Sequence, residues 1–184
     1  MTLKNRLIDL HNKIMGLPNF KLVVLMLILK IIVTAIVFPL FYIFPLEQSV
    51  YDSFDTSLVY QNAGIAQILY LVFNICIFVP LMETLLMQTL IIRVLMKIFK
   101  NKSKIYTIII PILISALVFG IAHFAFYKSF VKVLQTFLIG TILSYTYVVS
   151  YLNGKKATLN TAALHGLFVF LIILFDYIVN FILK

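Results

Sequence analysis

Cysteine, charged residues and repeats are all scarce in this chain, and each scarcity excludes a class of protein. Cys76 is the single cysteine, so no intrachain disulfide is possible, and no C-x-x-C pair begins a zinc-binding framework. Charged residues make up 11% of the chain. No internal repeat or low-complexity segment is present, and the apolar runs are continuous rather than alternating, which argues against a transmembrane β-barrel.

Apolar residues fill the chain instead. They account for 63% of it and the mean hydropathy is +1.11, whereas soluble domains have about 45–50% apolar residues. The net charge of +9 does not indicate a nucleic-acid partner, because the Lys and Arg residues gather at the ends of apolar runs and leave no soluble basic face. We therefore predict a membrane protein that contacts lipid and binds no nucleic acid.

Five apolar runs reach the length of about 20 residues that a membrane-spanning helix needs. We predict spans at residues 22–44, 64–92, 105–126, 131–151 and 158–182. The fold class expected is all-α, a polytopic transmembrane helix bundle. Residues 1–19 form a separate basic amphipathic segment that we expect to lie as a helix on the membrane surface, and residues 20–184 form the transmembrane domain.

The basic residues also predict the orientation, because cytoplasmic loops carry an excess of Lys and Arg. With the N-terminus inside, most of the 15 basic residues fall on the inner side, whereas the first outer loop, 45–64, carries three acidic residues and no basic one. We predict a multi-pass protein of the plasma membrane with a cytoplasmic N-terminus. The size and the Lys-, Ile- and Asn-rich composition fit a bacterial membrane.

Ionisable residues inside the predicted spans are few, and they include Lys30, Glu83, His123, His165 and Asp176. A charged group that faces lipid is unfavourable, so these side chains should face inward and find partners. We expect the Lys30 ammonium to extend toward the inner membrane surface along its flexible stem. The alternative is that it pairs with a buried acid or with a substrate carboxylate.

Glu83, His123 and His165 come from three different predicted helices, so helix packing can bring them together. A neutral histidine and a glutamate can position and deprotonate a water molecule. Two histidines and a glutamate can also hold a divalent metal such as zinc and leave a position for water. The simpler alternative is an interhelical Glu–His hydrogen bond that fixes helix packing and carries no chemistry.

Three short motifs contain these residues: ETLLMQ (83–88), FGIAH (119–123) and HGLFV (165–169). In order and spacing they resemble the motifs of the CAAX-protease and bacteriocin-processing (CPBP, or Abi) family of intramembrane proteases. The family's pattern is a Glu-Glu-x-x-x-Arg helix, a Phe-x-x-x-His helix and a His-x-x-x-Asn/Asp helix. The resemblance covers about residues 64–182.

The resemblance implies a role for each matching position. Glu83 matches the catalytic base, Phe119 and His123 match the second motif with its catalytic histidine, and His165 matches the histidine that helps to bind the water, or a metal, and the oxyanion. The family is described both as glutamate-dependent and as metal-dependent. A metal held by Glu83, His123 and His165 therefore stays an open alternative.

The chain departs from the family's pattern at three positions. Thr84 and Gln88 replace the second Glu and the Arg; they are four residues apart on a helix and can still hydrogen-bond. Both charges vanish together, so no unpaired charge remains, and the motif becomes a Glu-Thr-x-x-x-Gln variant. Val169 stands where the family has Asn or Asp, so a polar group one turn after His165 is missing.

The resemblance implies an intramembrane endopeptidase that cleaves a membrane-associated peptide or protein with a Glu/His-activated water. The alternative is a non-catalytic protein of the same fold, either a bacteriocin self-immunity protein or a regulatory partner of another membrane enzyme. A transport subunit is the weakest interpretation, because no inverted repeat and no pair of broken helices is present. Intact Glu83, His123 and His165 favour the protease, and Val169 favours the non-catalytic alternative.

Overall fold

The computed structural model describes residues 3–44 and 64–179, which are helical almost throughout and contain no strand. The first part holds α1 (Leu3–Met15), α2 (Asn19–Val37) and α3 (Leu40–Ile43). The second part holds α6 (Ile65–Phe73), η1 (Asn74–Phe78), α7 (Val79–Glu83), η2 (Thr84–Leu90), α8 (Ile91–Ile98), η3 (Ile105–Ile109), α9 (Ile110–Tyr127), α10 (Phe130–Leu152) and α11 (Ala157–Tyr177). The elements labelled η are π-helical.

Five helical stretches among the described residues are long and apolar enough to cross a membrane. They are residues 19–37, 65–98, 105–127, 130–152 and 157–177. The predicted all-α polytopic bundle is thereby confirmed, and the chain is a multi-pass membrane protein. The first span was predicted to reach residue 44, but α2 ends at Val37, just before Pro39, which lacks the backbone N–H that a continuing helix uses. The predicted acidic outer loop lies almost wholly outside the described residues.

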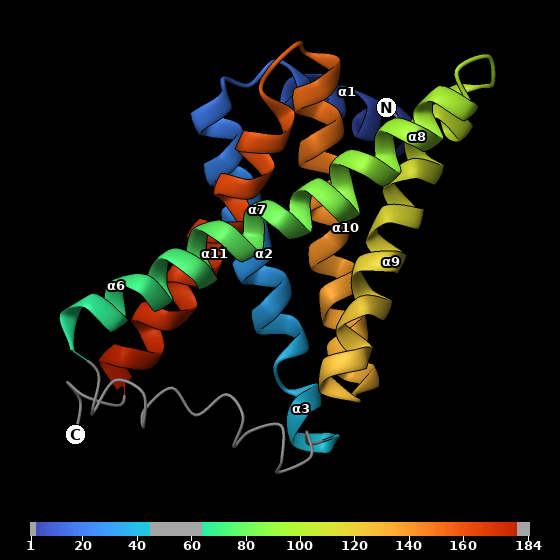
Figure 1. Cartoon of the computed structure of the whole chain (residues 1–184). Coiled ribbons are helices and arrows are strands. Elements are labelled where there is room, and N and C mark those ends of the chain that lie inside the picture. Colours follow the sequence, from blue (N-terminus) through green and yellow to red (C-terminus); the bar gives the residue numbers. More distant parts are fainter. Residues whose placement is uncertain (1–2, 45–63, 180–184) are drawn as a thin grey trace.

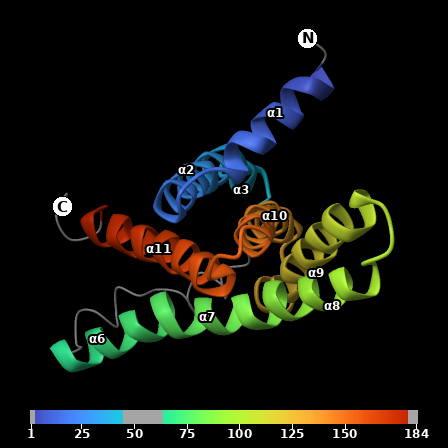
Figure 2. The same ribbon diagram turned by 90° about the horizontal axis from the view of Figure 1, so that it is seen from above.

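The bundle is organised around α10. Figure 2 looks along the bundle and places α10 at the centre, with α2, α9 and α11 around it. Small and hydroxyl residues allow close packing here: a Cβ added at Gly140 would lie 3.0 Å from the Phe119 ring of α9. The Ser144 hydroxyl lies 2.9 Å from that of Ser115 on α9. Within lipid no hydrophobic driving force holds helices together, so van der Waals packing through small residues stabilises the bundle instead.

The second span is one long helix, residues 65–98, made of α6, η1, α7, η2 and α8 and called the long helix below. Figure 1 shows it crossing the face of the bundle diagonally. Pro80 lies within this helix and does not break it. The π-helical η1 ends two residues before Pro80, and Pro80 itself occupies the start of α7, where a missing N–H is tolerated.

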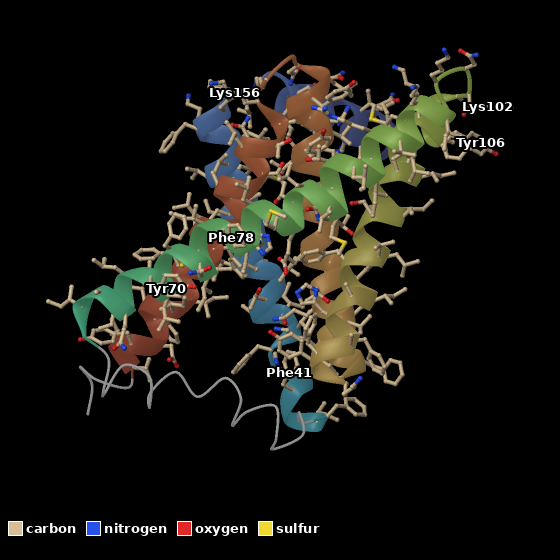
Figure 3. All side chains as sticks on the ribbon, viewed as in Figure 1. Phe41, Tyr70, Phe78, Lys102, Tyr106 and Lys156 are labelled. Atoms are coloured by element: carbon tan, nitrogen blue, oxygen red, sulfur yellow. The ribbon has the colours of Figure 1, made fainter. Side chains whose placement is uncertain are left out.

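The N-terminal helix α1 lies across one end of the bundle, and polar contacts from α1 and from the turn after it tie it there. The His11 Nδ1 lies 2.8 Å from the Tyr145 hydroxyl of α10. The Asn153 amide donates to the Met15 carbonyl at 2.7 Å, and the Lys155 ammonium donates to the Leu17 carbonyl at 2.5 Å. Lys102 and Lys156 lie at this same end of the molecule (Figure 3), so the N-terminal helix and the two basic loops share one side.

Candidate functional site

Glu83 lies in the interior stretch of the long helix, at a change of helical geometry. It is the last residue of α7, and the π-helical η2 begins at the next residue. Such π-helical turns are uncommon and occur frequently at functional sites. The helix is held here by Ser115 of α9, whose hydroxyl donates to the Met87 carbonyl at 2.6 Å. The position of the Glu83 carboxylate along the bundle is therefore fixed by a contact one turn away.

Helix α11 brings His165 to this carboxylate. The His165 Nε2 lies 3.6 Å from the Glu83 Oε2, and the His165 side chain is 10% exposed, whereas Glu83 is half-buried. The other ring nitrogen of His165, Nδ1, is buried and has no hydrogen-bond partner among the described residues. The two helices also meet at Thr89 and Thr158, whose hydroxyl oxygens are 3.0 Å apart.

Helix α9 contributes His123 and an aromatic side chain between the two histidines. The His123 Nδ1 lies 2.8 Å from the Phe119 carbonyl, so this nitrogen carries the proton and donates. The Phe119 ring contacts the His123 ring at a centroid distance of 4.6 Å and the His165 ring edge-on at 5.8 Å. The Tyr127 ring is stacked parallel to the His123 ring at a centroid distance of 6.1 Å. The imidazole of His123 is thus held in a defined orientation.

A cavity of about 260 Å³ lies beside these groups. Its walls come from the long helix and α9, and they are Glu83, Met87, Phe119, Ala122, His123, Phe126 and Tyr127. The structure therefore places Glu83, Phe119 and His123 on one cavity, while His165 lies behind Glu83 and contacts its carboxylate. Tyr127 also lines this cavity, although it lies outside the three motifs. The one signal for it in the sequence is its spacing of four residues from His123, which puts both on the same helix face.

The expected Thr84–Gln88 hydrogen bond is not formed. Both side chains are completely buried, and the Thr84 hydroxyl and both polar atoms of the Gln88 amide have no hydrogen-bond partner in the described part of the chain. The reason is the π-helical geometry of residues 84–90, in which hydrogen bonds join residues five apart, so residues four apart are no longer aligned.

The Lys30 ammonium does not extend to the membrane surface, which corrects the expectation from the sequence. The side chain is 0% exposed, and its Nζ lies 4.2 Å from the centroid of the Phe168 ring on α11. The prediction was wrong because Lys30 follows Leu22 and Met26 at intervals of four residues, and this face of α2 is the one that packs into the bundle.

The metal alternative was tested against the donors that the structure brings together. Within residues 3–44 and 64–179, no three His, Cys, Asp or Glu side chains are grouped closely enough to hold one metal ion. The Nδ1 of His123 already contacts the Phe119 carbonyl, and His165 does not line the cavity. The donors as arranged do not fit a shared zinc ion.

Gly166, beside His165, allows α11 to approach the long helix. A Cβ at this position would collide with the carbonyl oxygen of Cys76. That carbonyl lies four residues before Pro80, so it lacks its usual α-helical donor. The glycine therefore lets α11 pack against the backbone of the long helix and brings His165 within reach of Glu83.

We expect Gly166→Ala to destabilise the protein by about 1–3 kcal/mol, because the added methyl group forces the two helices apart. Thermal unfolding of the purified protein in detergent, together with its abundance in the membrane, measures the effect. Gly64→Ala is the matched control, because a Cβ at Gly64 meets no atom within 4 Å. Equal stability of the two variants would contradict the assigned contact.

Comparison with known proteins finds a family model that matches the part of the chain containing these residues. The family model described as "Type II CAAX prenyl endopeptidase Rce1-like" matches residues 65–171, which is more than half of the chain. The match includes Glu83, His123 and His165, and it leaves α1 and α2 outside. Searches of curated proteins and of solved structures find no significant match.

Proposed function

The chain belongs to the type II CAAX prenyl endopeptidase Rce1-like family, and from that premise we propose that it is an intramembrane endopeptidase. Its substrate is a membrane-associated peptide or protein, and the reaction is hydrolysis of one peptide bond. The observation that carries this proposal is the joint placement of a glutamate and a histidine on one cavity, with a second histidine 3.6 Å behind the glutamate.

In the proposed mechanism Glu83 acts as the general base. It takes a proton from a water molecule in the cavity while the water oxygen attacks the carbonyl carbon of the scissile bond. His123 donates through Nδ1 to the Phe119 carbonyl, so its Nε2 is the acceptor and orients the water. When the carbon–nitrogen bond breaks, the protonated Glu83 returns its proton to the leaving amine. His165 holds the Glu83 carboxylate in place throughout.

A second, apolar cavity supports a lipid-bearing substrate. It has a volume of about 530 Å³ and lies between the long helix and α11. The residues that line it are apolar. Two of them are near the site in sequence: Leu81 precedes Glu83 by two residues, and Gly166 follows His165. We propose that it takes the hydrocarbon chain of a lipidated peptide, a substrate class that agrees with the family's description.

The direct test is cleavage of a farnesylated peptide by the purified protein in liposomes, followed by mass spectrometry. In ¹⁸O-labelled water the new carboxyl group should gain one ¹⁸O atom, because hydrolysis adds the water oxygen there. An otherwise identical peptide without the farnesyl group should be cleaved less. If neither peptide is cleaved and no other membrane peptide is, the non-catalytic alternative, a self-immunity protein or regulatory partner, replaces the protease.

We also propose that the end of the molecule carrying α1, Lys102 and Lys156 faces the cytoplasm of a bacterial cell. Basic loops favour the inner side. Single-cysteine variants S103C and F130C, made in a Cys76→Ser background, lie at opposite ends of the bundle. In intact cells a membrane-impermeant maleimide should label F130C and should label S103C only after permeabilisation. The reverse pattern would invert the orientation.

A further inference from the structure

Lys30 is the inward-facing residue of a turn of α2 whose other side chains face outward. Its neighbours Ile28, Leu29, Ile31 and Ile32 are 51%, 42%, 46% and 47% exposed, whereas Lys30 is 0% exposed. This turn of α2 therefore directs four apolar side chains outward and its one charged side chain into the bundle. Burial of an ammonium is unfavourable, so this arrangement needs a compensating interaction.

The compensation comes from two sides of the candidate site. The Phe168 ring, three residues after His165 on α11, receives the ammonium at 4.2 Å as a cation–π contact. The charge of Lys30 is also within electrostatic reach of the Glu83 carboxylate, which has the opposite sign. The Lys30 Nζ has no hydrogen-bond partner in the described part of the chain, so its three donors remain available.

Glu83 is the acidic residue suited to balance this charge. The other acids in the described residues are Asp9, which pairs with Lys13 on α1 at 2.9 Å, and Asp176, in the last turn of α11. Lys30 does not line the cavity beside Glu83, which argues against direct contact with a substrate carboxylate. Its ammonium lies instead in the protein interior, over the Phe168 ring.

We propose that Lys30 is the counter-charge of Glu83 and a positioning residue for the reaction. The ammonium offsets the charge of the Glu83 carboxylate within the membrane. When the water proton moves to Glu83, the negative charge passes to the carbonyl oxygen of the substrate, and Lys30 remains the nearby positive charge at both stages. The catalytic part of this inference rests on the proposed function, but the pairing of Lys30 with Glu83 does not.

A double-mutant cycle on thermal stability tests the pairing without an activity assay. It compares the wild type with Lys30→Met, Glu83→Gln and the double variant, each purified in detergent. Lys30→Met alone leaves a carboxylate unbalanced and should lower the unfolding temperature by roughly 4 °C or more. In the Glu83→Gln background, Lys30→Met should leave the unfolding temperature unchanged or raise it, because the carboxylate that Lys30 balances is no longer present.

Lys21→Met is the matched control, since Lys21 is exposed on the same helix and should show the same small effect in both backgrounds. If Lys30→Met alone gives no folded protein, recovery of folded protein in the double variant supports the pairing. Equal losses in both backgrounds, or no recovery, would show that Lys30 only packs against Phe168 and would overturn the inference.

Kinetics separate the two proposals. If the protein cleaves the farnesylated peptide, Lys30→Met should lower kcat and leave KM nearly unchanged, because Lys30 lies outside the cavity. A rise in KM alone would contradict the positioning role. If the cycle shows coupling but no peptide is cleaved, the charge pair stands and the proposed protease function fails.

Discussion

The Glu83→Gln variant should lose turnover by about 10²-fold or more while it remains folded in the membrane. Glutamine keeps the shape of the side chain and its place beside the His165 ring, which lies 3.6 Å from the carboxylate. An amide cannot accept the water proton, so the step that generates the nucleophile is lost. Rates of cleavage of the farnesylated peptide, measured at equal amounts of folded protein, report the loss.

Asp9→Asn is a suitable control for this experiment. It is also a change from carboxylate to amide, but Asp9 lies on α1 in an exposed ion pair with Lys13. Exposed pairs of this kind contribute little to stability, so the variant should cleave at the normal rate. Full activity of Glu83→Gln at normal abundance would rule out Glu83 as the base.

His123→Ala should also reduce turnover by about 10²-fold, because the water loses the acceptor that orients it. The combined variant with Glu83→Gln should fall by far less than the product of the two losses, about 10⁴-fold, since residues that act as one catalytic unit are not additive. Losses that multiply would indicate that His123 and Glu83 act independently, contrary to the mechanism.

The control for His123 is His11→Ala. His11 also loses a polar contact when it is replaced, the one to the Tyr145 hydroxyl at 2.8 Å, but it lies on α1 and does not line the cavity. A comparison of the two variants therefore separates the loss of a histidine contact from the loss of catalysis. His11→Ala should lower the unfolding temperature and leave kcat nearly unchanged.

The spans and the family could be predicted from the sequence, because both depend on local features. Length and hydropathy determine which segments can cross a bilayer, and the five spans follow from them. Glu83, His123 and His165 stand out because ionisable groups are so rare within the spans. Their order along the chain was sufficient to identify the family that the comparison then showed.

The direction of Lys30 could not be predicted, and the reason is specific to membranes. In a soluble helix the buried face is recognised because the opposite face is polar. In α2 the residues facing lipid are as apolar as those facing the bundle, so hydropathy does not distinguish the two faces. The contact with Phe168 depends on how α2 and α11 pack, which is a property of the whole bundle.

The π-helical geometry of part of the long helix could not be predicted from the sequence either. Pairing Thr84 with Gln88 assumes the α-helical spacing of four residues, whereas residues 84–90 form a π-helical stretch. Residues 84–90 contain no proline or glycine that would indicate the change from α-helical to π-helical geometry. Contacts with neighbouring helices, such as the hydrogen bond from Ser115 to the Met87 carbonyl, accompany this geometry, and they depend on the packing of the whole bundle.

The diagonal path of the long helix has a consequence for the surrounding lipid. The 28 residues of this helix before Arg93, residues 65–92, measure about 42 Å at 1.5 Å each, against a hydrocarbon layer of about 30 Å. Such hydrophobic mismatch is relieved by strong tilt or by local deformation of the bilayer. A deformed leaflet beside this helix would bring headgroups and water closer to the depth of Glu83, so the lipid itself would shorten the path between the aqueous phase and the site.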